Sequence, residues 1–171
     1  ALSPTQVGAL TAAQMQGLGE SQAASFLGVQ TARLTSTALL NLNTAAVAAL
    51  TTAAVSGLNA SQFAAMTTEQ LVALTQQQAA SLSADQLSGL SGNQVAAMQT
   101  DDLSSITQSA LSGLSTSAVQ SLLTTQVNAL TSLQTQALKG NQVAALTVAQ
   151  AQDLGVDQAG GFSAVQISQL G

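Results

Sequence analysis

The sequence lacks cysteine, histidine, tryptophan and tyrosine, and it contains only three phenylalanines and one proline. Without His and Cys, the usual ligands of zinc and haem iron are missing. A serine or cysteine triad would also lack its usual base, histidine. Because there is no cysteine, no disulfide framework stabilises the chain. We therefore predict that the protein is not an enzyme and that it has no catalytic residues, no metal ligands and no cofactor.

Charge is scarce as well, with two basic residues against seven acidic ones and a net charge of −5. Nucleic-acid binding depends on clustered Lys and Arg and often on stacked aromatic side chains, and aromatics are only 2% of this chain. Gln, Ser and Thr interrupt every apolar stretch well before the roughly 18 to 20 residues of a membrane-spanning helix. We expect no nucleic-acid partner, no membrane insertion and no small-molecule substrate.

The sequence is instead one uninterrupted array of eight-residue repeats over residues 1–171, which we treat as a single domain and as a fragment or filament unit of a longer array. The consensus octad is L-[S/T]-x-x-Q-[V/L]-x-[A/G/S], and its positions are numbered 1 to 8 from the Leu. Position 1 holds a large apolar residue in every octad, from Leu2, Leu10 and Leu18 through Met66 and Met98 to Leu170. Position 6 is also apolar, except at Thr31 and Thr135.

A period of eight fits neither a continuous helix nor a continuous strand. At about 100° per residue, a position-1 stripe would drift around a helix by roughly 80° per octad. In a strand, positions 1 and 6 would lie on opposite faces. The Ala, Leu and Gln content favours helices, so we predict a helix that restarts in every octad.

The restart signal is a capping box, Ser/Thr-x-x-Gln, at positions 2 to 5. Position 2 is mostly Ser or Thr, and position 5 is mostly Gln, as in Gln6, Gln14, Gln62, Gln70, Gln86, Gln94, Gln142, Gln150 and Gln166. The acidic residues other than Asp153 lie at positions 3 to 5, where the first helical turn favours an anion. Each octad should therefore be one capped helix of about one and a half turns.

One octad buries too little apolar surface to fold alone, so the units must stack into a solenoid with a continuous core. The predicted fold is an all-α solenoid or superhelical rod of very short helices. Positions 1 and 6 should lie inside, and positions 3, 4 and 7 should face water. The small residues at position 8 either let two backbones approach or let the chain turn.

Units such as LTTAAVSGL (50–58), LSADQLSGL (82–90) and LTTQVNAL (123–130) resemble the octapeptide arrays of large, repetitive bacterial surface or secreted adhesin-like proteins. The resemblance implies an extracellular or cell-surface location and a structural or adhesive role. It implies no haem binding here, since His, Cys and Tyr are missing.

Three functions follow as hypotheses: a self-associating structural filament, fibre, sheath or matrix component; a rigid stalk of a giant adhesin; and an ice-binding-like surface built on the Ser/Thr row. The Gln row could cap helices or bind a surface or a second rod, and capping is the favoured interpretation. Asp101 and Asp102 could ligate calcium, although a helix N-terminus explains them better. Met66 and Met98 are predicted to be core residues.

Overall fold

The computed structural model describes residues 2–170, and within them it contains 21 helices of four to six residues and no strand. The helices are α1 (Pro4–Gly8), α2 (Ala12–Gln16), α3 (Glu20–Ala23), α4 (Gly28–Thr31), α5 (Ser36–Leu40), α6 (Thr44–Ala49), α7 (Thr52–Ser56), α8 (Ala60–Ala64), α9 (Thr68–Val72), α10 (Gln76–Ala80), α11 (Ala84–Ser88), α12 (Gly92–Ala97), α13 (Thr100–Ser105), α14 (Gln108–Leu111), α15 (Thr116–Gln120), α16 (Thr124–Ala129), α17 (Ser132–Ala137), α18 (Gly140–Val143), α19 (Val148–Gln152), α20 (Val156–Gly161) and α21 (Ala164–Ile167). The prediction of one short helix per octad is confirmed.

Position 2 is the N-cap of each helix, where the backbone is extended, and in most octads its side chain caps the first turn. In α11, the Ser83 hydroxyl accepts the Gln86 N–H at 3.2 Å, and Gln86 Oε1 accepts the Ser83 N–H at 2.9 Å. This is the predicted capping box. A short turn closes the helix, in which the N–H of position 1 donates to the carbonyl of position 6, as from Leu90 to Leu87 at 3.2 Å. Local hydrogen bonds therefore set both ends of every unit.

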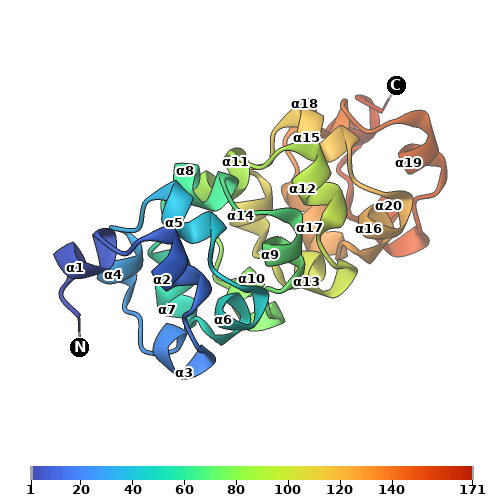
Figure 1. Cartoon of the computed structure of the whole chain (residues 1–171). Helices are drawn as coiled ribbons and strands as arrows, with labels where there is room; N and C mark the ends of the chain where they lie inside the picture. The colour runs from blue at the N-terminus through green and yellow to red at the C-terminus, as the bar shows by residue number, and fades with distance from the viewer. Residues whose placement is uncertain (1, 171) are drawn as a thin grey trace.

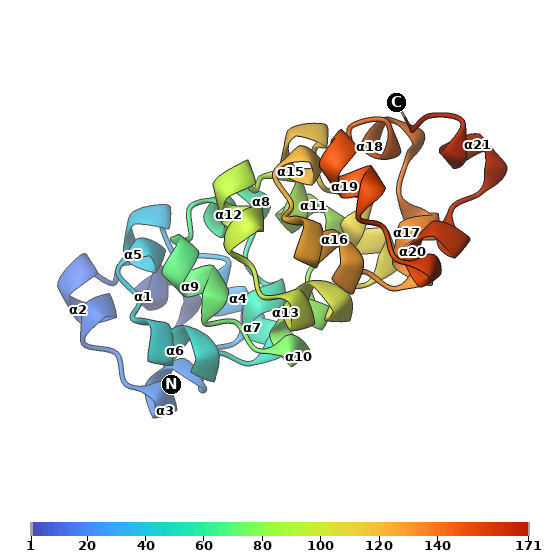
Figure 2. The same ribbon diagram turned by 90° about the vertical axis from the view of Figure 1, so that its right-hand side faces the viewer.

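The helices wind into a superhelix with three octads per turn. Each helix packs against the third helix before it and the third helix after it, as α8 does with α5 and α11. Figures 1 and 2 show the resulting elongated rod, with α1 near one end and α21 near the other. The predicted all-α solenoid is confirmed, and the structure adds the number of octads per turn.

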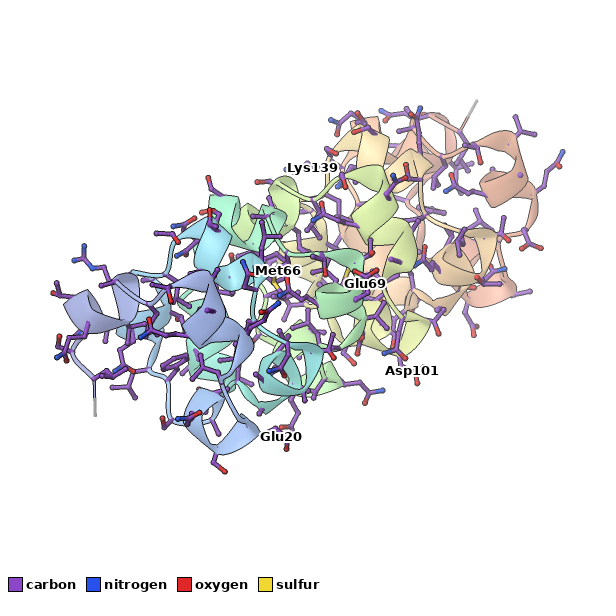
Figure 3. All side chains as sticks on the ribbon, viewed as in Figure 1. Glu20, Met66, Glu69, Asp101 and Lys139 are labelled. Atoms are coloured by element: carbon purple, nitrogen blue, oxygen red, sulfur yellow. The ribbon has the colours of Figure 1, made fainter. Side chains whose placement is uncertain are left out.

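The core runs along the axis of the rod and is built from positions 1 and 6, as predicted. Leu87 at position 6 is fully buried, and Leu90 at position 1 is 3% exposed. Met66 and Met98 are core residues, and Figure 3 shows Met66 in the middle of the packed side chains. No residue at positions 3, 4 or 7 is buried within residues 2–170, which confirms the predicted outer face. Position 5 is also buried through most of the rod, which the pattern did not predict.

Close approach of backbones explains the small residues at position 8. No residue from 2 to 170 has a positive φ, so these glycines are not used for left-handed turns. Gly57 in the α7 octad instead lies against Gly28 at the start of α4, one turn earlier. A Cβ atom on Gly57 would overlap the backbone of Gly28. Gly113 lies in the same way against Ala84. Of the two alternatives for position 8, the structure selects close approach between superhelical turns.

Candidate functional site

The most regular polar feature of the molecule is a row of glutamines at position 5 that joins successive superhelical turns. Gln86 Nε2 donates to the carbonyl oxygens of Val55 and Leu58, each at 2.9 Å. These acceptors lie 31 and 28 residues earlier, at the C-terminal end of a helix in the preceding turn. Because Oε1 already caps α11, one side chain ties the start of a helix to the end of another. We call this row the Gln ladder.

The ladder repeats the same bonds through most of the chain. Gln126 donates to Val95 and Met98, and Gln150 donates to Val119 and Leu122, at 2.6 to 3.0 Å. Its members from the first cross-turn bond onward are Gln30, Gln62, Gln70, Gln78, Gln86, Gln94, Gln126, Gln134, Gln142, Gln150, Gln158 and Gln166. Position-1 carbonyls such as that of Leu58 accept no backbone N–H within residues 2–170, so the ladder amide is their partner. Position-6 carbonyls such as that of Val55 accept both the ladder amide and the N–H of the next position-1 residue.

The burial of the Gln side chains decides between the two interpretations of the Gln row. Ladder residues such as Gln86 and Gln126 are 2% and 1% exposed, respectively. Such buried amides cannot bind a surface or a second rod along the length of the molecule. The capping interpretation is confirmed, and sequence reasoning missed the cross-turn role because the acceptors lie about 30 residues away. The Ser/Thr row also caps helices, and its ice-binding alternative stays a prediction.

Two superhelical turns interrupt the ladder. Position 5 holds Ala38, Ala46 and Ala54 in three consecutive octads, and Asp102, Ala110 and Ala118 in three others. We call these the first Ala turn (34–57) and the second Ala turn (98–121). An amide at position 2 partly replaces the missing one. In the first Ala turn, Asn43 Nδ2 donates to Leu18 O at 2.9 Å, and in the second, Gln99 Nε2 donates to Val72 O at 2.8 Å.

The two polar breaks in the position-6 series are satisfied by cross-turn hydrogen bonds. The buried Thr31 hydroxyl donates to the Ala54 carbonyl at 2.7 Å, in the next turn. The Thr135 hydroxyl reaches the Gln158 carbonyl at 3.2 Å with the same sequence separation of 23 residues. Both threonines therefore fill a core position without leaving a buried hydroxyl unpaired.

The N-terminal end of the rod presents unused ladder amides. Gln6, Gln14 and Gln22 accept the N–H groups of their own position-2 residues at 2.8 to 2.9 Å. Their side chains are exposed, and their Nε2 atoms make no hydrogen bond within residues 2–170. No earlier turn in the described chain supplies acceptors for them. This N-terminal face therefore offers three amide donors, one from each octad of a complete turn.

The C-terminal end presents the complementary groups. The last three position-1 residues, Leu154, Phe162 and Leu170, have carbonyls that a ladder amide would meet 28 residues later, and none receives one within the described chain. Position 6 loses its cover in the same turn, where Ile167 is 53% exposed and Ala159 is also exposed. This C-terminal face therefore offers three carbonyl acceptors beside uncovered core positions.

The acidic residues act individually. Glu20 and Asp101 lie at the periphery of the rod in Figure 3. Glu20 is in the first turn of α3, and Asp101 is in the first turn of α13. Hydrogen bonds from its own backbone N–H and from Thr67 lower the pKa of Glu69. Burial and the neighbouring Asp101 raise the pKa of Asp102 to about 6. Within residues 2–170, no three His, Cys, Asp or Glu residues gather as a metal site would require, and Asp101 and Asp102 have no third carboxylate beside them.

The described helices are all too short and polar to span a bilayer. With its stacked octads and a core along its axis, the chain is an all-α solenoid repeat protein. Comparison with known families agrees, because the ALTTAQ repeat family matches residues 42–76. The matched segment contains octads of the first Ala turn, with Ala46 and Ala54 at position 5, and ladder octads, with Gln62 and Gln70 at position 5. None of the curated proteins matches the chain.

Proposed function

We propose that this chain is a structural repeat protein that builds an extracellular or cell-surface filament, fibre, sheath or matrix by stacking rods end to end. The observation that carries the proposal is the polarity of the Gln ladder: its amides bond carbonyls of the preceding turn, so any stretch of the array has amide donors on one side and carbonyl acceptors on the other. Three amide donors at one end match three carbonyl acceptors at the other. The extracellular location is carried by the resemblance to repetitive surface proteins.

The stacked contact would repeat the bonds of the interior. Within the rod, position-5 amides meet position-1 carbonyls 28 residues earlier, as Gln150 meets Leu122. Placing a second copy in the first register that avoids overlap of the two chain ends brings Gln6, Gln14 and Gln22 of that copy to Leu154, Phe162 and Leu170. Ile167 would be covered in the same way that interior position-6 residues are covered. Each amide–carbonyl bond typically contributes about 1 kcal/mol, and apolar burial adds to it.

Such a contact is head to tail, so it propagates along one axis and does not close into a pair. An adhesin stalk would use the same rod differently, because flanking repeats of one polypeptide would cover both faces. The scarcity of Lys and Arg and the absence of His and Cys support a structural role over an enzymatic one.

The decisive experiment follows the purified 171-residue chain by sedimentation velocity and negative-stain electron microscopy over a range of protein concentrations. The proposal predicts filaments with the diameter of one rod and a length that grows with concentration. A chain that stays monomeric at every concentration would contradict self-assembly and favour the stalk.

Two variants test the polarity of the contact. One carries Gln6→Ala, Gln14→Ala and Gln22→Ala on the N-terminal face, and the other carries Ile167→Glu on the C-terminal face. Circular dichroism establishes that each variant remains helical. Each variant alone should remain monomeric, whereas an equimolar mixture should form one-to-one dimers that grow no further. Filaments from either variant alone would show that these faces do not mediate assembly.

A further inference from the structure

Asp102 is the one charged residue at position 5, where every other octad has Gln or Ala. It lies at position 5 of α13, where the Gln ladder places an amide in most octads and where the other exceptions are alanines. Asp102 is 3% exposed, and its Oδ2 atom is buried without a hydrogen-bond partner among the described residues. An unpaired buried carboxylate oxygen is costly, so the protonation state of this group matters for the stability of the turn.

The ladder geometry indicates what Asp102 faces. The carbonyls 31 and 28 residues before it are those of Leu71 and Leu74, at the C-terminal end of α9. Elsewhere in the ladder, the equivalent carbonyls accept hydrogen bonds from a Gln amide. Gln99 bonds the carbonyl between them, that of Val72. An ionised carboxylate can only accept hydrogen bonds, whereas a protonated one can also donate. Only the protonated form can therefore take over the role of the missing amide.

No positively charged side chain lies on the helices around Asp102 to stabilise its ionised form. The helices packed against α13 are α10 and α16, and neither carries a titratable side chain. The flanking helices α12 and α14 carry none either. Helix α9, whose C-terminal carbonyls Asp102 faces, carries the exposed Glu69, which is negative and cannot pair with a carboxylate. The charged group that raises the pKa of Asp102 is the adjacent Asp101, which repels a second negative charge. Burial and this repulsion both favour the neutral acid, and the pKa of about 6 has these two causes.

We propose that Asp102 makes the second Ala turn an acid-stabilised joint, closed when its carboxyl group is protonated and loosened when it is ionised. The ordinary pKa of 3.8 lies below the folded value of about 6, so the folded state binds the proton more tightly. The stabilisation is fully present below about pH 3.8 and is lost as the pH rises through about 6. The rod should therefore open first at this turn near neutral pH.

Amide hydrogen exchange at pH 4.5 and 7.5, corrected for the intrinsic pH dependence, tests the joint. We expect protection factors in α10 and α13 of the unmodified chain to fall by about 10- to 100-fold at the higher pH, as a pKa shift of this size allows. Helices α5 and α8, which pack against each other and against α2 and α11, serve as an internal reference. Unchanged protection in α10 and α13 across this range would overturn the proposal.

Two variants locate the effect. Asp102→Gln restores the ladder amide and should hold the protection of α13 at its acidic level at both pH values. Asp85→Asn removes an exposed carboxylate from α11 and should leave the pH dependence as it is in the unmodified chain. If Asp102→Gln keeps the full pH dependence, another group is responsible. If that variant does not fold, a carboxyl titration of the unmodified chain by NMR decides, because a pKa near 4 for Asp102 contradicts the joint.

Discussion

The ladder turns and the Ala turns of this rod join the same kinds of helix by different forces. In the ladder turns, a buried Gln amide bonds two carbonyls of the preceding turn, as Gln126 does with Val95 and Met98. In the Ala turns, position 5 is a buried methyl group in every octad except that of Asp102, and small residues at position 8 bring backbones together, as at Gly57 and Gly28. One junction depends on hydrogen bonds, and the other depends on close packing.

The difference shows that the octad fold accepts either Gln or Ala at position 5. A Gln side chain bridges the gap between turns and satisfies helix C-terminal carbonyls. An alanine, or Asp102, leaves most of those carbonyls without an amide, and within residues 2–170 only Asn43 and Gln99 supply a substitute from position 2. Five consecutive ladder octads, from Gln62 to Gln94, separate the two Ala turns. The rod therefore alternates between strongly and weakly hydrogen-bonded turns.

The largest effect is expected from removing one ladder amide. Gln86→Ala should lower the free energy of unfolding by about 3–5 kcal/mol, because it leaves a cavity and removes bonds to two buried carbonyls. Urea denaturation followed by circular dichroism measures the loss.

Gln14→Ala is the matched control, since Gln14 makes the same capping bond at 2.9 Å but no cross-turn bond within residues 2–170. It should cost only about 0.5–1 kcal/mol, as for the loss of a cap. Equal losses in the two variants would mean that Gln86 acts through capping alone.

A smaller effect is expected from breaking the close packing of the first Ala turn. Gly57→Ala places a Cβ atom against the Gly28 backbone, so α4 and α7 must separate. We expect a loss of about 2–3 kcal/mol in the free energy of unfolding, in the range of overpacked cores.

Gly160→Ala provides the comparison, because a Cβ atom there meets nothing within 4 Å. That variant should be neutral or gain up to about 1 kcal/mol, because alanine reduces the freedom of the unfolded chain. Thermal denaturation of both variants measures the difference. A stable Gly57→Ala rod would show that close backbone approach is dispensable.

The smallest effect is expected from converting an Ala turn toward a ladder turn. Ala54 is fully buried in the octad that contains Gly57, so Ala54→Gln must force its side chain into a packed contact. We expect a loss of about 1–2 kcal/mol in the free energy of unfolding. Urea denaturation of this variant decides between two views of the Ala turns. A gain in stability would mean that Ala54 marks an unfilled ladder position, not a separately packed junction.

The octad itself predicted the local structure correctly. The Ser/Thr-x-x-Gln box placed a helix start in every repeat, and positions 1 and 6 were identified as the core. Both predictions succeed because capping bonds span three residues and the apolar period is regular along the chain. The expectation that the chain has no catalytic site came from composition, since the chain carries no His or Cys, and it stays a prediction.

Features that depend on residues one superhelical turn apart appear only in the folded rod. These are the three octads per turn, the cross-turn bonds of the Gln ladder, the close approach at Gly57 and the opposite chemistry of the two end faces. A repeat of eight specifies each helix, but the angle between helices depends on how turns pack on one another. The partners of Gln86 lie 28 and 31 residues away, so local pattern alone identified its capping role and left its second role unseen.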